Sequence, residues 1–162
     1  MPDLTPLASS LGALLKARGQ TVAIAESACG GLISAALVAV PGASAYYLGG
    51  SVVYTQASRE GLMHVTSDMM EGMRASTEAY ALMNARIIRD KLGATWALSE
   101  TGASGPTGNR YGDAAGHACM AVFGPVERSM TLETGSADRE ANMWTFAKTA
   151  LDLLESCIKE QG

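Results

Sequence analysis

The sequence has few of the residues that disulfide frameworks and zinc sites need: three cysteines and two histidines among 162 residues. Cys29, Cys119 and Cys157 are odd in number and far apart, so they fit neither a disulfide framework nor a CxxC metal motif. The histidines, His64 and His117, form no HxxH or HExxH pair. We therefore expect no metal ion, no other cofactor and a reducing, cytoplasmic environment.

Excess positive charge and long apolar runs are also lacking. The formal net charge is -4 and the pI is about 5.1, which argues against binding to nucleic acid or to an anionic membrane surface. The longest apolar run, residues 32–40, is too short to cross a bilayer, and residues 1–10 have no secretory-signal pattern. Hydrophobic residues make up 48% of the chain, enough for a core. We expect one domain over residues 1–162.

Hydrophobic periodicity predicts that helices and strands alternate along the chain. Helical spacing predicts helices over residues 7–19, 30–40, 57–63, 77–92 and 136–158, with a short one after Thr66 or Ser67. Apolar and β-branched runs predict strands over residues 20–26, 45–56, 94–100, 114–124 and 128–135. The last two form an antiparallel hairpin around Gly124-Pro125. The pattern predicts a three-layer α/β/α sandwich with a mixed, mostly parallel sheet and one antiparallel hairpin.

Two loops with polar and glycine residues follow predicted strands. The first, AESACGG, covers residues 25–31, and the second covers residues 99–113 and contains TGASGPTG. In open α/β sheets, ligands bind beyond the carboxyl ends of the strands. A purely structural loop is usually shorter than the second one in a small domain. We therefore expect the two loops to form a ligand site together.

The first loop supports two interpretations. In one, Ser27 or Cys29 is a nucleophile, and the backbone N–H groups around Gly30 and Gly31 hold an anion or oxyanion at a helix N-terminus. That position would lower the pKa of the Cys29 thiol. In the other, the loop is a plain helix cap in which Ser27 and Glu26 complete the first turn. The presence of the second polar, glycine-rich loop at the same edge favours the first interpretation, a ligand site.

Four segments, AESACGG, PGASAYYLGGSVVYTQASREGLM, TGASGPTG and TGSADREA, resemble in this order the CinA C-terminal domain family, which also occurs alone as nicotinamide-mononucleotide deamidase. The resemblance spans residues 7–154. It implies hydrolysis of the carboxamide of nicotinamide mononucleotide to the acid nucleotide and ammonia. It also implies an α/β/α fold and, often, a dimer. We accordingly expect an amidohydrolase with a small nucleotide substrate, and a homodimer in which the methionine-rich segment 63–73 offers a contact surface.

The resemblance and the two loops together indicate which residues form the site. The resemblance implies Ser27 as nucleophile with Tyr54 and Thr101, and Arg59, at the position of the family's lysine, completes the expected catalytic residues. The resemblance also implies Gly102, Gly105 and Arg139 as substrate-binding residues, and the two loops add Glu26, Cys29, Gly30, Gly31 and Ser104.

Several positions depart from the family pattern, and Arg59 is the most important because the family has lysine there. Lysine can act as a base when its pKa is lowered, whereas arginine stays protonated and can only hold an anion. Other departures are Ala28 for cysteine, Cys29 for threonine, Gln56 for asparagine, Ser104 for alanine and Asn109 for glycine. Two alternatives therefore stand beside the deamidase: a nucleotide-binding paralogue without activity, and an amidase that uses Cys29 on another substrate.

Three further predictions concern polar residues near these motifs. Glu100 is either an exposed loop carboxylate, which we favour, or a substitute general base. His117 is expected to be a sheet residue of the hairpin rather than a catalyst. Cys119 and Cys157 are expected to be buried as small hydrophobic residues.

Overall fold

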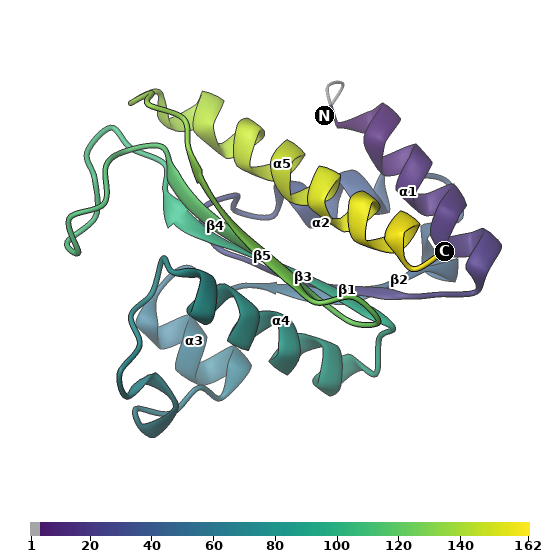
Figure 1. The fold of residues 1–162 in the computed structure, drawn as a ribbon, viewed down its shortest axis with the longest axis horizontal. Coiled ribbons are helices and arrows are strands. Elements are labelled where there is room, and N and C mark those ends of the chain that lie inside the picture. Colours follow the sequence, from purple (N-terminus) through teal and green to yellow (C-terminus); the bar gives the residue numbers. More distant parts are fainter. Residues whose placement is uncertain (1–3) are drawn as a thin grey trace.

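A five-stranded sheet forms the middle layer of the computed structural model, which describes residues 4–162 (Figure 1). The strands are β1 (Val22–Glu26), β2 (Tyr47–Val52), β3 (Trp96–Ala103), β4 (His117–Phe123) and β5 (Arg128–Glu133), and they lie in the order β2-β1-β3-β4-β5. Strand β1 pairs in parallel with β2 and β3, while β4 pairs antiparallel with β3 and β5. Only β4 therefore runs against the other four strands, which confirms the predicted mixed, mostly parallel sheet with one hairpin.

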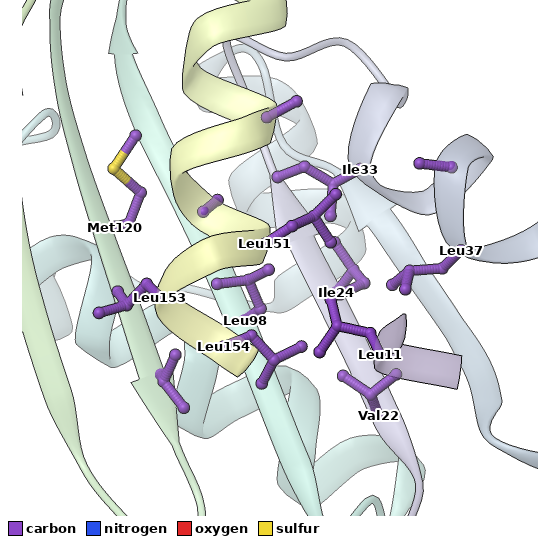
Figure 2. Packing of buried hydrophobic residues seen from close by; sticks show 14 of the residues in the cluster. Leu11, Val22, Ile24, Ile33, Leu37, Leu98, Met120, Leu151, Leu153 and Leu154 are labelled. Carbon is purple, nitrogen blue, oxygen red and sulfur yellow. The ribbon is translucent and has the colours of Figure 1, made fainter. Parts of the chain in front are cut away.

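Helices cover both faces of the sheet, as the three-layer prediction requires. On one face lie α1 (Thr5–Arg18), α2 (Leu32–Val38) and α5 (Arg139–Glu160); on the other lie α3 (Gln56–Met63) and α4 (Glu78–Leu92) (Figure 1). Every residue of β1 is buried, because helices pack against the strand from both sides. Figure 2 shows Leu151 and Leu154 of α5 pointing toward Ile24 and Leu98 on the sheet. None of the helices within residues 4–162 combines the length and the apolar character that a membrane crossing requires.

Local signals fixed several helix ends as predicted. Gly19 and Gly93 end α1 and α4 in the left-handed conformation, with φ of 62° and 67°. Thr77 begins α4 by accepting a hydrogen bond from the Tyr80 N–H. Short-range chemistry of this kind needs no tertiary contact, so the sequence was enough to predict it.

Other boundaries differ from the prediction. Helix α2 begins at Leu32 rather than Gly30, because Gly30 and Gly31 have φ of 64° and 106° and belong to the preceding turn. The segment after Ser67 forms only a single 3₁₀ turn, η2 (Asp68–Met70), and α5 begins at Arg139, capped by Asp138 rather than Ser136. A second 3₁₀ turn, η1 (Ala43–Ala45), precedes β2.

Strand β3 is longer than predicted, and this difference determines where the site residues lie. The sequence places the end of the strand at residue 100, but β3 continues through Ala103, so Thr101 and Gly102 pair with Cys119 and Ala118 of β4. A Cβ atom at residue 102 would lie 2.5 Å from the His117 carbonyl oxygen, so only glycine fits this close approach. Thr101 and Gly102 are therefore held by the sheet and not by a loop.

Candidate active site

The carboxyl ends of the parallel strands β1 and β3 meet at one edge of the sheet, and a cavity of about 300 Å³ lies there. Its lining residues come from the ends of β1, β2 and β3, from α3 and α4 and from the two segments before α4 and before β4: Ser27, Val53, Tyr54, Thr55, Gln56, Arg59, Ala75, Ser76, Tyr80, Thr101, Gly102, Asn109, Arg110 and Tyr111. A second cavity of about 210 Å³ shares Tyr54, Gly102 and Asn109 with it and extends to Ser104, Gly105 and Arg139.

Most of the expected site residues line these two cavities. Ser27, Tyr54, Arg59 and Thr101, the four implied catalytic residues, all line the larger one. Four of the implied substrate-binding residues line the smaller one: Gly102, Ser104, Gly105 and Arg139. The other four, Glu26, Cys29, Gly30 and Gly31, are not among the lining residues of either cavity in the described part of the chain.

Glu26 stabilises the loop from inside. Its carboxylate is fully buried and accepts hydrogen bonds from the N–H groups of Gly31 at 2.9 Å, Ile33 at 3.1 Å and Ser34 at 2.9 Å. Glu26 thus caps α2, where a negative charge is favoured, and lines neither cavity. The Ser27 hydroxyl makes no hydrogen bond within residues 4–162 and is left to the cavity, so the plain-cap interpretation applies to Glu26 alone.

The thiol of Cys29 is buried, and the predicted lowering of its pKa is wrong. Burial and the neighbouring carboxyls of Glu100 and Glu26 raise the pKa of Cys29 well above its ordinary value. Its Sγ lies 3.7 Å from the Met143 carbonyl oxygen, on the α5 side. Because α2 begins two residues later than predicted, the thiol does not sit at an open helix N-terminus, and this weakens the alternative of a Cys29-dependent amidase.

Glu100 is buried, which contradicts the expectation of an exposed loop carboxylate. Its exposure is 2%, and its Oε2 atom accepts hydrogen bonds from the N–H groups of Ser27 at 3.0 Å and Cys29 at 3.1 Å. Its Oε1 atom is buried and has no hydrogen-bond partner in the described residues. Burial raises the pKa of Glu100 to about 7; the two N–H groups oppose this shift and the charge of Glu26 adds to it. The strand predicted from the sequence ended at residue 100. Had it continued to Gly105-Pro106, the next turn signal, Glu100 would have lain inside the strand.

Arg59, Arg110 and Arg139 at the cavities carry charges that no carboxylate in the described residues neutralises. The Arg59 guanidinium lies 5.8 Å from the centre of the Tyr80 ring and forms no ion pair within residues 4–162. Arg139 donates through Nη2 to the Tyr54 hydroxyl at 2.8 Å and through Nη1 to the Gly105 carbonyl, both neutral acceptors. Uncompensated guanidinium groups are suited to hold an anionic ligand such as a phosphate.

The segment between β3 and β4 closes one side of the larger cavity. Asp113 receives two hydrogen bonds from Arg74, at 2.8 and 3.1 Å, and one from the Asn109 side chain at 2.7 Å. The guanidinium groups of Arg74 and Arg110 lie 5.0 and 5.1 Å from the centre of the Tyr111 ring. The sequence analysis did not identify Arg110 or Tyr111 as site residues, although an arginine-tyrosine pair inside a glycine-rich loop was a usable signal.

His117 lies within β4, as predicted, and supports the cavity wall. It is buried, and its Nε2 lies 2.8 Å from the carbonyl oxygen of Ser76, a lining residue with a left-handed φ of 61°. Its Nδ1 lies 2.5 Å from a Glu133 carboxylate oxygen. Cys119 and Cys157 are buried, as predicted.

Comparisons with known proteins place these features in context. The family model described as the CinA C-terminal domain matches residues 4–158. The chain is 38% identical over 123 residues to the CinA-like protein of Prochlorococcus marinus (strain MIT 9313), covering 76% of this chain and 29% of the relative. It is 37% identical over 150 residues to the CinA-like protein of Salinibacter ruber (strain DSM 13855 / M31), covering 93% of this chain and 36% of the relative. Such relatives are much longer: the chain spans 29–38% of their length.

Solved structures of CinA-related proteins also superimpose closely on this chain. The CinA superfamily protein KP700603 of Klebsiella pneumoniae 700603 superimposes with a TM-score of 0.90 at 25% identity, covering 97% of this chain and 98% of that one. The competence/damage-inducible protein CihA of Agrobacterium tumefaciens superimposes with a TM-score of 0.88 at 26% identity, covering 96% and 95%.

Proposed function

Because the chain belongs to the CinA C-terminal domain family, we propose that it is an amidohydrolase that converts nicotinamide mononucleotide to the acid nucleotide and ammonia. The observation that carries this proposal is the meeting of Ser27, Thr101, Tyr54 and Arg59 on one cavity beside unneutralised positive charge. A volume of about 300 Å³ with an adjoining pocket of about 210 Å³ suits a ligand of nucleotide size.

Ser27 is the proposed nucleophile. Its Oγ attacks the carboxamide carbon, ammonia leaves, and water then releases the acid from the acyl-enzyme. The Ala28 N–H, which follows Ser27 directly, makes no hydrogen bond within residues 4–162 and can donate to the oxyanion. The Thr101 side chain, on the adjacent strand, lines the same cavity and can orient the carboxamide.

The phosphate of the substrate is assigned to the arginines. Arg139, whose present acceptors are both neutral, gains an ionic partner when phosphate binds in the smaller cavity. The tyrosines of the larger cavity provide flat surfaces for the pyridine ring: Tyr54, Tyr80 and Tyr111.

The test is an ammonia-release assay on nicotinamide mononucleotide. We expect measurable turnover by the wild-type chain and none by Ser27→Ala, because the latter lacks the attacking oxygen. Ser9→Ala, an exposed serine on α1, is the matched control and should keep wild-type turnover. Ammonia release by Ser27→Ala at the wild-type rate would disprove the assignment of the nucleophile.

One observation favours a second candidate, a nucleotide-binding protein without activity. Arg59 occupies the position of the family's lysine and cannot accept a proton. Calorimetry separates the two candidates: binding of nicotinamide mononucleotide together with no ammonia release would favour the second.

A further inference from the structure

The buried carboxyl of Glu100 lies directly behind the loop that carries Ser27. Its Oε2 atom accepts the N–H groups of Ser27 and Cys29, and its Oε1 atom has no hydrogen-bond partner in the described residues. A buried carboxyl oxygen without a partner costs stability and is therefore unusual. The second buried carboxyl of this loop differs, because both oxygens of Glu26 accept N–H groups of the α2 N-terminus.

We propose that Glu100 is the general base of the serine chemistry, so that its unpaired Oε1 takes the Ser27 hydroxyl proton when Oγ attacks the carboxamide carbon. The inference rests on the proposed amidohydrolase function. In the first step the Oγ–carbon bond forms, the carbonyl π electrons move to the oxygen, and the proton moves to Glu100. When the carbon–nitrogen bond breaks, Glu100 returns this proton to the leaving nitrogen, which departs as ammonia.

The carboxyl contacts the backbone of the residue that carries the hydroxyl. The Ser27 amide nitrogen is 3.0 Å from Oε2, and one rotatable bond sets the position of the Ser27 Oγ among three staggered rotamers. Glu100 lines neither cavity, so the proposal requires the rotamer in which Oγ lies between the carboxyl behind the loop and the substrate in the cavity. No hydrogen bond within residues 4–162 holds the hydroxyl elsewhere. Arg59, the nearest counterpart of the family's lysine, cannot take a proton.

The charge state of Glu100 also suits this role. Burial raises the pKa of Glu100 to about 7, so that both protonated and ionised forms are present at neutral pH, where a general base is most effective. The titratable groups that face it are Glu26 from β1 and Cys29 from the loop, and its cross-strand neighbour Met120 is apolar. The N–H groups of Ser27 and Cys29 favour the ionised form against burial.

Labelling of Ser27 with diisopropyl fluorophosphate tests the proposal without depending on the substrate. In this reaction the Oγ–phosphorus bond forms, fluoride leaves, and the hydroxyl proton goes to the base. Mass spectrometry follows the modified peptide between pH 5.5 and 8.5 in the wild type, Ser27→Ala and Glu100→Gln. Glutamine keeps an acceptor for both N–H groups but cannot take the proton. Thermal unfolding shows that each variant is folded.

We expect the wild-type labelling rate to rise through about pH 7, and Glu100→Gln to label about 10²–10⁴-fold more slowly without that rise. Ser27→Ala should not be labelled. Three results would each overturn the proposal. They are labelling of Glu100→Gln at the wild-type rate, a pH profile in that variant unchanged from the wild type, and no labelling of Ser27 in the wild type.

If Glu100→Gln does not fold, Glu100→Asp decides, because it keeps the carboxyl but withdraws it by one methylene. Its labelling rate should fall at least about tenfold while the rise with pH remains, and a wild-type rate would overturn the proposal. The ammonia assay separates this result from the proposed function. Glu100-dependent labelling without ammonia release would mean that the base is right and the substrate is wrong.

Discussion

The side chain at position 59 is an arginine, whereas the motif that the chain resembles has lysine. The guanidinium lines the larger cavity and stays protonated, so it contributes charge but no proton transfer. At this position the chain therefore lacks the proton acceptor that a lysine would provide.

We expect Arg59→Lys to raise the turnover of nicotinamide mononucleotide, by up to about 10²-fold, because it restores a group that can accept a proton at the position where the family motif has lysine. Steady-state ammonia release measures the effect. Arg110→Lys, at another arginine of the same cavity, is the control and should bring no increase. Equal or lower turnover in Arg59→Lys would show that the cavity has no use for a lysine at this position.

Glu100 should also affect stability as a function of pH. Its pKa is raised in the folded chain to about 7 from an ordinary value of 4.5, so the folded state binds the proton more tightly than the unfolded state. Its contribution is fully present below pH 4.5 and is lost as the pH rises through 7, by up to about 3 kcal/mol.

Urea unfolding at pH 5 and pH 8 measures this dependence. The free energy of unfolding of Glu100→Gln should fall less between these two values than that of the wild type, since the variant has no proton to lose. An identical fall in both proteins would mean that Glu100 does not titrate in this range.

At the scale of elements, β3 and its pairing with β4 position one wall of the site. Thr101 and Gly102 belong to this pair, and Glu100 and Thr101 point to opposite faces of the sheet because side chains alternate along a strand. One strand thus presents Thr101 to the cavity and Glu100 to the loop that carries Ser27.

Gly102→Ala should destabilise this pair. The new Cβ would meet the His117 carbonyl oxygen at 2.5 Å and the Ala118 backbone at 2.9 Å, so the strands must separate, at a cost of about 1–3 kcal/mol. Gly61→Ala in α3 is the matched control: nothing lies within 4 Å of its Cβ position, and alanine should be stabilising by about 0.5–1 kcal/mol. Thermal unfolding compares the two, and a smaller effect at residue 102 than at residue 61 would contradict the prediction.

At the scale of the whole molecule, the edge strand β2 leaves apolar side chains in contact with solvent. Leu48 and Val52 are 43% and 41% exposed, and Leu62 on α3 is 54% exposed. The methionine-rich segment contributes less than expected, because Met63 is buried in the core and only Met69 is largely exposed, at 39%. The edge strand therefore offers the more extended apolar surface.

We propose that the chain forms a homodimer, as the resemblance implied. Light scattering at micromolar concentration should give twice the monomer mass of 16.8 kDa. Replacement of Leu48 by lysine should shift the mass toward the monomer if β2 is the contact, because a charge on an edge strand opposes pairing. A mass of 16.8 kDa for the wild type would refute the dimer.

The sequence alone determined the order of helices and strands, several helix ends and the edge of the sheet where the two cavities lie. These features depend on short-range physics: the period of apolar residues, glycine at a left-handed helix end and a hydroxyl at a helix start. Ser27, Tyr54, Arg59 and Thr101 were identified from their motifs, and the structure brings all four to one cavity.

Only the tertiary structure decided the chemical state of the buried groups. Glu100 contacts Ser27 from 73 residues away in the chain, and its burial requires that β3 extend along β4. The pKa of Cys29 rises because the thiol is buried and because it lies near the carboxyls of Glu100 and Glu26, which come from different strands. Desolvation and charge proximity depend on atoms that are distant in sequence, so no local pattern could have predicted them.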